Sequence, residues 1–130
     1  MKIFTTNIKE DALEDNYFRK VLFTSKSSQL VLMSLKPGED IGEEVHKVDQ
    51  TLIFVEGHGK AKLDGDEYEI KPNSIFCVPA GTKHNFINSE DGYMKLYTIY
   101  APAEHKEGAI HKTKEDAEKA EESGEDHPQA

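Results

Sequence analysis

Apolar residues recur in short runs between residues 17 and 101, and polar turn signals separate these runs every roughly eight to twelve residues. The first two runs, YFRKVLFT and QLVLMSL, flank the polar turn SKSS, which is a β-hairpin pattern. Six further runs follow, with Pro, Gly, Asn and Asp in the turns between them: QTLIFVEG, GKAKLDG, DEYEI, SIFCVPAG, HNFIN and YMKLYTIYAP. Many short strands with regular turn signals predict an all-β protein folded as a sandwich or a closed barrel.

Some of these predicted strands are apolar on both faces. In QLVLMSL, Leu30 and Leu32 point to one side, and Val31 and Met33 point to the other. A strand with one wet face would alternate between apolar and polar residues. We therefore expect the second face to be covered, either by a second copy of the chain in a homodimer or by the N-terminal segment.

The chain divides into an N-terminal segment (residues 1–16), the predicted β domain (17–102) and an acidic tail (103–130). The tail has nine acidic residues against four lysines, and its apolar residues are mostly alanine. Opposite charges four residues apart, as at Glu115 and Lys119, favour a helix. We predict a short surface helix from about Lys112 to Glu122 that contributes nothing to the core and continues into a disordered end.

The composition of the chain limits which partners and which cellular location we expect. At 130 residues the chain is long enough for one domain, and its net charge of −9 argues against nucleic-acid or anionic-membrane partners. The longest aliphatic or aromatic runs, such as LVLM and LIFV, are far too short to cross a bilayer, and the N-terminus shows no secretory signal. The lone Cys77 lies in the apolar stretch SIFCVP, where we expect a buried thiol. A reducing, cytoplasmic location is the prediction.

Four polar residues interrupt the apolar pattern. Glu44, His46 and Gln50 stand at even positions just before an apolar strand, so they share one of its faces. His84 follows a Pro-x-Gly turn and shares a face with Phe86. If the two strands are neighbours, the four side chains converge at one mouth of the barrel. Burying such a cluster in an apolar interior costs free energy unless a charged partner interacts with its polar atoms. A divalent metal ion is the simplest such partner.

The spacing of these residues resembles the two motifs of the cupin family, G-x5-H-x-H-x3-4-E-x6-G and G-x5-P-x-G-x2-H-x3-N. Residues 38–57 fit the first motif, with Glu44 in place of its first histidine and Gln50 in place of its glutamate. Residues 73–88 fit the second, with Asn73 in place of its first glycine. The resemblance covers about residues 28–101 and implies a single cupin barrel of the jelly-roll type.

The resemblance also implies metal ligands at Glu44, His46, Gln50 and His84. Two imidazoles, one carboxylate and one amide oxygen suit iron, manganese, nickel or zinc, so the identity of the ion stays open. Each residue also has a purely structural alternative. The histidines could be hydrogen-bonded residues at the barrel mouth, Glu44 a solvated acid at a strand entrance, and Gln50 an amide that orients a water or a substrate hydroxyl.

The stretches RKVLFT, QLVLMSLKPGEDIGEEVH and PAGTKHN are similar to small single-domain cupins that are grouped with mannose-6-phosphate isomerases. This resemblance implies a small sugar-like or keto/hydroxy substrate. The leading hypothesis is a metal-dependent isomerase or hydrolase in which Glu44 is the general base and Gln50 positions a hydroxyl. The alternatives are a non-haem iron dioxygenase and a non-catalytic module that binds a small molecule or a metal.

Residues after the second motif add further candidates. Tyr97 or Tyr100 could send its phenol into the pocket, although such residues are more often core or dimer-contact aromatics. Thr98 has the parity of an inward-facing residue. His105 and His111 lie beyond the barrel, where we expect a surface loop; the alternative is a lid over the barrel mouth.

Overall fold

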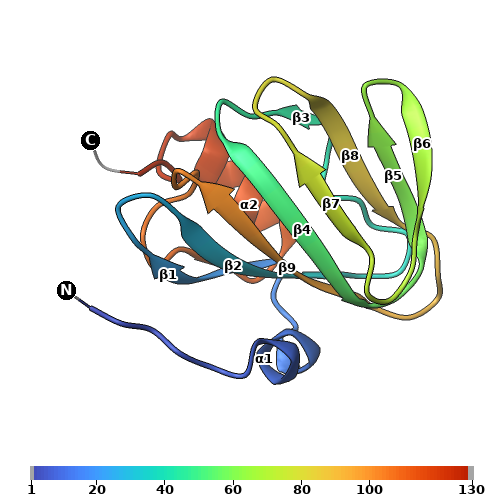
Figure 1. Cartoon of the computed structure of the whole chain (residues 1–130), viewed down its shortest axis with the longest axis horizontal. Coiled ribbons are helices and arrows are strands. Elements are labelled where there is room, and N and C mark those ends of the chain that lie inside the picture. The colour runs from blue at the N-terminus through green and yellow to red at the C-terminus, as the bar shows by residue number, and fades with distance from the viewer. Residues whose placement is uncertain (1, 129–130) are drawn as a thin grey trace.

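The computed structural model describes residues 2–128, which form two antiparallel β-sheets that face each other (Figure 1). The six-stranded sheet contains, in spatial order, β10 (Ile110–His111), β1 (Arg19–Thr24), β2 (Gln29–Leu35), β9 (Met94–Ala101), β4 (Asp49–Glu56) and β7 (Ile75–Val78). The four-stranded sheet contains β3 (Glu44–Val45), β8 (Lys83–Asn88), β5 (Gly59–Leu63) and β6 (Asp66–Ile70). The predicted all-β barrel of the jelly-roll type is confirmed.

The core lies between the two sheets. Met33, Leu96 and Phe54 are register partners across β2, β9 and β4, and all three are fully buried. Phe86 from β8 packs against them from the other sheet, with its ring centroid 5.7 Å from that of Phe54. Inward-facing residues of both sheets therefore interdigitate, as two packed sheets require.

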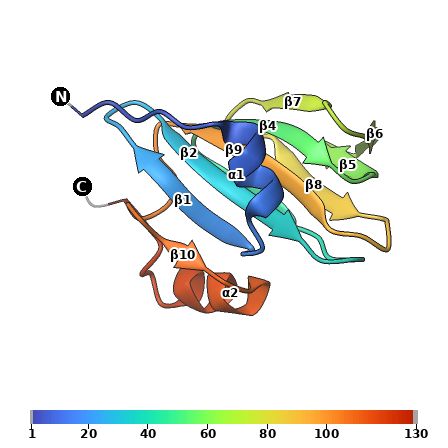
Figure 2. The same cartoon turned by 90° about the horizontal axis from the view of Figure 1, so that it is seen from below.

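The N-terminal segment covers part of the outer face of the six-stranded sheet. Its helix α1 (Ile8–Glu14) begins at the cap residue Asn7, whose side chain accepts a hydrogen bond from the backbone N–H of Glu10. The helix contacts β2, β9 and β4, and Figure 2 shows it lying across these strands. Leu32 is buried beneath this layer, on the outer face of β2. The N-terminal segment, one of the two predicted covers, thus accounts for the burial of Leu32 and for part of this second face.

The tail is more structured than we expected. Helix α2 (Lys114–Glu122) begins after the cap residue Thr113, close to the predicted start. Strand β10 precedes it and pairs with β1, so His111 lies opposite Arg19. Ala117 of α2 is buried in the core cluster, so the prediction that the tail contributes nothing to the core is wrong. Pairing of β10 with the sheet edge brings the helix onto the barrel, and a small side chain is enough to pack there.

The predicted disordered end lies partly outside the described residues, because the structure describes the chain only to residue 128. Asp126, which falls within the predicted disordered part, is buried. Within residues 2–128, no helix combines the length and the apolar character needed to cross a lipid bilayer.

The prediction of a buried Cys77 is wrong, because its side chain is exposed. Strand β7 is the edge strand of its sheet and pairs only with β4. Its neighbour residues Phe76 and Val78 face the core, so alternation along the strand sends Cys77 to the outer face. The apolar run SIFCVP indicated a strand correctly, but the outer face of β7 is exposed, whereas α1 packs on β2, β9 and β4.

Gly59 in β5 is required by a close approach between strands. A Cβ atom at this position would lie 1.9 Å from the carbonyl oxygen of Ile87 and 2.8 Å from the Cε of Met94. We expect Gly59→Ala to lower the free energy of unfolding by about 2–3 kcal/mol, because the backbone of β8 must move. Gly92→Ala is the matched control, since an added Cβ there has no neighbour within 4 Å. Equal urea midpoints for the two variants would contradict the prediction.

Candidate metal centre

The antiparallel pairing of β3 with β8 brings the two motifs together. Glu44 and His84 are register partners in this pair. His46 lies in the connection between β3 and β4, and its ring centroid is 5.0 Å from that of His84. Gln50, near the start of β4, lies opposite Tyr100 of β9, whose ring packs edge-on against His46 at 5.7 Å. The predicted convergence of the four side chains at one end of the barrel is therefore observed.

His46 is buried between two carboxylates. Its Nε2 lies 3.1 Å from Oε2 of Glu44, and its Nδ1 lies 3.0 Å from Oε2 of Glu104. Burial lowers the pKa of His46, but the hydrogen bond with Glu104 and the charges of both carboxylates outweigh it and raise the pKa above its usual value. Burial opposes ionisation of Glu104 as well, yet the His46 hydrogen bond holds the pKa of Glu104 below its ordinary range. Both pKa shifts and the 3.0 Å contact thus couple His46 most closely to Glu104.

Glu44 behaves differently from Glu104. Burial raises the pKa of Glu44, and the nearby charge of His46 only partly offsets this effect. A carboxyl group with a raised pKa is easier to protonate near neutral pH than an exposed one. This property suits a group that exchanges a proton with a ligand.

His84 is held in a fixed orientation by the backbone. Its Nδ1 donates a hydrogen bond to the carbonyl oxygen of Thr82 at 2.8 Å. Because a carbonyl only accepts, Nδ1 carries the proton and Nε2 keeps its lone pair. Burial, reinforced by the charge of His46, lowers the pKa of His84. His84 is therefore a neutral imidazole, the form that binds metal ions.

Gln50 has one side of its amide satisfied and the other side free. The side chain is 3% exposed, and its Nε2 donates to Oγ1 of Thr98 at 3.1 Å and to the hydroxyl of Tyr100 at 3.2 Å. Its Oε1 is buried without a hydrogen-bond partner. Thr98 and Tyr100 both point into the barrel, and burial raises the pKa of Tyr100, so its hydroxyl stays protonated. An orphaned buried oxygen of this kind requires a ligand, an ion or a water.

The donor atoms are of the types that bind divalent ions, and the spacing of one pair of them suits a shared ion. Adjacent ligands at about 2.1 Å from one ion stand roughly 3 Å apart, which matches the 3.1 Å between Glu44 and His46. The unpartnered Oε1 of Gln50 supplies a further oxygen. Within residues 2–128, however, no three His, Cys, Asp or Glu side chains are already arranged as a metal-binding group. Binding would therefore need side-chain movement, and the ligand assignment stays a prediction.

The tail folds back against this end of the barrel. His105 is 5% exposed and packs edge-on against Tyr100, with ring centroids 5.0 Å apart. Its Nδ1 lies 2.7 Å from Oδ2 of Asp126, which also lies 3.8 Å from NH1 of the buried Arg19. His111 is buried too. The expectation of a surface loop is wrong, because Asp126 holds His105 in a buried position and strand β10 carries His111 into a buried position at the sheet edge.

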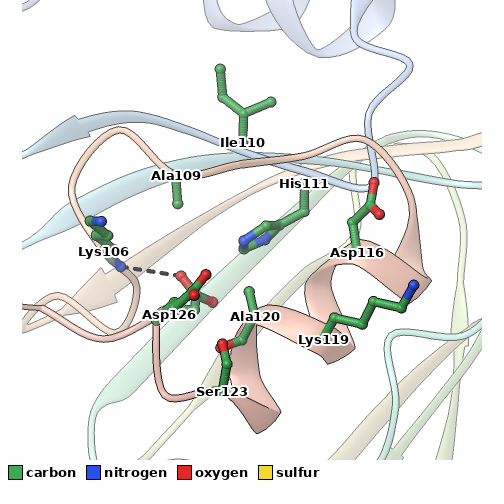
Figure 3. Close-up of a pocket in the computed structure, with 10 residues that line it drawn as sticks. Lys106, Ala109, Ile110, His111, Asp116, Lys119, Ala120, Ser123 and Asp126 are labelled. Atoms are coloured by element: carbon green, nitrogen blue, oxygen red, sulfur yellow. Dashed lines mark hydrogen bonds between the residues drawn. The ribbon is translucent and has the colours of Figure 1, made fainter.

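A pocket of about 540 Å³ lies between β10, α2 and the end of the tail (Figure 3). His111 lines it from β10, and Asp126 lines it from the end of the tail, where Oδ1 of Asp126 accepts a hydrogen bond from the backbone N–H of Lys106. None of the four predicted ligands lines this pocket. It is a separate feature of the tail.

The buried state of His105 makes stability depend on pH. Burial lowers the pKa of His105 to about 4, with the charge of Arg19 acting in the same direction. Between pH of about 6.5 and 4 the unfolded chain binds more protons than the folded chain, so the free energy of unfolding falls as the pH is lowered through this window, by up to about 3 kcal/mol. The pKa of His46 is raised instead, so His46 stabilises the fold at low pH, and this contribution is lost as the pH rises above the same window.

Urea unfolding at pH 7, 5.5 and 4.5 measures this effect. A His105→Gln variant, which has no imidazole to protonate, should show a shallower loss of stability across the same range. Identical pH dependence in both proteins would contradict the prediction.

Sequence reasoning missed two charged residues near the site. Glu104 contacts His46, and Arg19 is 5% exposed with an unpartnered Nε. Arg19 has the same strand parity as the buried Val21, which was a usable signal for an inward-facing charge. Nothing in the local sequence distinguishes Glu104 from the other acids of the tail.

Comparison with known proteins agrees with the fold and the motifs. The Cupin domain family matches residues 31–100, and this chain belongs to that family. The uncharacterized protein YrkC of Bacillus subtilis is 43% identical over 127 residues, which cover 92% of this chain and 68% of the relative. The crystal structure of BH2720 from Bacillus halodurans superposes with a TM-score of 0.90 at 36% identity, covering 92% of this chain and 96% of that one.

An enzyme is among the more distant relatives. The 5-nitrosalicylic acid 1,2-dioxygenase of a Bradyrhizobium species is 29% identical over 66 residues, which cover 51% of this chain and 32% of the relative. The shared region is therefore about a third of the length of that enzyme.

Proposed function

We propose that this cupin is a metal-dependent enzyme in which Glu44, His46, Gln50 and His84 hold a divalent ion, zinc, manganese, iron or nickel, beside a small-molecule site. The main support is the buried Oε1 of Gln50, which has no hydrogen-bond partner beside two imidazoles and a carboxylate. A bound ion would act as a Lewis acid that lowers the free-energy cost of negative charge on a substrate oxygen during isomerisation or hydrolysis.

The side chains around the site have distinct roles in this proposal. Glu44, whose pKa is raised by burial, is the general base that takes a proton from the substrate when it is not bound to the ion. Gln50 accepts a hydrogen bond from a substrate hydroxyl or contributes its oxygen to the ion. Tyr100 accepts from Gln50 and keeps its own proton, so it is placed to donate to a substrate oxygen.

The balance of charge favours an uncharged substrate. Arg19 is close enough to influence Glu44 and Asp126, and Glu104 lies beside the site as well. The charges of a divalent ion and of Arg19 are matched by the carboxylates of Glu44, Glu104 and Asp126, and Glu121 adds a further negative charge near Glu44. With no surplus positive charge to attract an anion, the site suits a neutral hydroxy or keto compound, as a sugar-like substrate would be.

A second candidate is a non-haem iron dioxygenase. Two histidines and one carboxylate with open coordination positions are the ligand set of such enzymes. The similarity to 5-nitrosalicylic acid 1,2-dioxygenase supports this candidate, although the match covers only 32% of that enzyme.

Metal reconstitution tests the proposal. The protein is stripped with a chelator, reloaded with zinc, manganese, iron or nickel, and screened by thermal shift against neutral sugars, ketones and hydroxy acids. A ligand at 100 times its Kd should stabilise the loaded protein by about 2.7 kcal/mol, and turnover should follow reloading with one metal.

The outcomes separate the candidates. Turnover that needs iron and consumes oxygen identifies the dioxygenase. Ligand binding to the loaded protein without turnover favours a non-catalytic module. Failure of the stripped protein to take up any of the four metals contradicts the proposal.

We also propose that the chain forms a homodimer through the outer face of the six-stranded sheet. Helix α1 contacts β2, β9 and β4, but Ile75 on β7 remains 59% exposed and Ile99 on β9 remains 38% exposed. Ile53 on β4 lies opposite Ile75 and joins the two into an apolar surface. Analytical ultracentrifugation at micromolar concentration measures the oligomeric state, and a monomer would contradict this proposal.

A further inference from the structure

We propose that Glu104, supplied by the tail, is a positioning residue that orients His46 toward the metal centre. This inference depends on the proposed metal centre and adds a role for a residue outside both cupin motifs. It assigns to the tail a function at the site rather than a purely structural one.

The geometry around His46 carries the inference. Glu104 and Glu44 stand at opposite nitrogens of the same imidazole, with Oε2 of Glu104 at 3.0 Å from Nδ1 and Oε2 of Glu44 at 3.1 Å from Nε2. A carboxylate accepts only, so Nδ1 is the donor to Glu104. Nε2 faces the Glu44 carboxylate and is the nitrogen that would give up its proton when an ion binds between the two side chains. A histidine that binds a metal usually donates its other ring N–H to a carboxylate or a carbonyl, which fixes its tautomer and its orientation.

His84 shows the same arrangement with a different partner. Its Nδ1 donates to the carbonyl of Thr82 at 2.8 Å and leaves Nε2 free. Both histidines of the predicted ligand set therefore have Nδ1 occupied by an oxygen acceptor. One acceptor belongs to the cupin motif region, and the other comes from Glu104 in the tail.

Gln29 places Glu104 where it can reach His46. The side chain of Gln29, on β2, is 1% exposed. Its Oε1 accepts hydrogen bonds from the backbone N–H groups of Glu104 at 3.2 Å and of His105 at 2.9 Å. Its Nε2 donates to the carbonyl of His105 at 2.8 Å and to Oγ1 of Thr24 at 2.9 Å. Three of the four hydrogen bonds of the Gln29 amide thus hold the tail backbone against the sheet, and the fourth fixes the amide to Thr24 on β1.

A simpler role for Glu104 would be to fasten the tail by its ion pair with His46. The two roles differ in what they affect. A fastening role changes the stability of the metal-free protein and leaves the affinity for the ion unchanged. A positioning role changes that affinity and the ligand field of the bound ion.

The test compares wild type with Glu104→Gln and Glu104→Ala. Affinity is measured by competition with a chromophoric chelator, using Ni²⁺ and Zn²⁺ alone as probes, and the visible spectrum of the Co²⁺-loaded protein reports the ligand field. We expect Glu104→Ala to weaken binding about 10–100-fold and to shift the Co²⁺ spectrum. Glu104→Gln, whose amide oxygen still accepts from Nδ1, should be intermediate.

Two further variants complete the design. Gln29→Ala should weaken metal binding in the same direction as Glu104→Ala, because it releases the backbone that places the carboxylate. Glu107→Gln is the matched control, since Glu107 is an exposed acid of the same tail segment. Circular dichroism confirms that each variant is folded before its affinity is measured.

Each outcome has a definite meaning. Wild-type affinity and an unchanged Co²⁺ spectrum in a folded Glu104→Ala variant would overturn the positioning role while leaving the metal centre intact. A wild-type protein that binds none of these ions would overturn the proposed function itself, and the positioning role with it.

Discussion

Replacement of His46 and His84 together by alanine is expected to abolish metal binding. Both histidines are buried at the end of the barrel, with ring centroids 5.0 Å apart, and Nε2 of His84 has a free lone pair. Removing two nitrogen ligands leaves only the carboxylate of Glu44 and the neutral oxygen of Gln50, a set that holds first-row ions weakly. The loss should exceed the roughly 10–100-fold that follows removal of an outer hydrogen-bond partner.

Elemental analysis of protein purified without added metal measures this effect. Wild type should carry metal in proportion to chain concentration, and the double variant should be at background. His58→Ala is a suitable control, because His58 lies in the turn between β4 and β5 with half of its side chain exposed. Equal metal content in wild type and the double variant would end the metal hypothesis for this site.

Substitution of Asp126 by alanine should cause a large loss of stability. Asp126 is buried, accepts hydrogen bonds from Nδ1 of His105 at 2.7 Å and from the backbone of Lys106 at 3.2 Å, and faces Arg19 at 3.8 Å. Without it, the guanidinium of Arg19 becomes a buried charge with no nearby counter-ion in the tail. Removal of one partner of a buried pair costs about 3–5 kcal/mol, and the long distance to Arg19 favours the lower end of this range.

Urea unfolding at pH 7 measures the loss, and Glu125→Ala provides the comparison. Glu125 is adjacent, has the same charge and is exposed, so its replacement should change the free energy of unfolding by less than about 0.5 kcal/mol. Similar midpoints for the two variants would mean that the end of the tail does not support the barrel. That result would agree with the original prediction of a disordered end.

The β domain was predictable because its signals are local. Alternation and turn residues mark the strands, so the hairpin of β1 and β2 around SKSS falls where the pattern placed it. The paired motifs placed Glu44 opposite His84 and brought His46 and Gln50 beside them. The parity of Thr98 likewise indicated an inward-facing residue, and its side chain is fully buried.

The tail was not predictable on the same grounds. Its charge and low apolar content are typical of a solvated helix, yet β10 adds to the sheet edge and His105 packs on Tyr100. The partners that bury these groups, Arg19 and Gln29, lie more than seventy residues earlier in the chain. Cys77 shows the opposite error, because an apolar run does not reveal whether another element covers the outer face of its strand.

The amino-acid sequence by itself determined the class of fold and the four side chains that meet at one end of the barrel. Periodicity and motif spacing carry this information because they depend on backbone geometry within each strand and its turns. Only the tertiary structure decided that Glu104 reaches His46 and that Arg19, His105 and Asp126 share a buried cluster. Contacts between residues far apart in the chain depend on how the tail returns to the barrel, and no local pattern records that path.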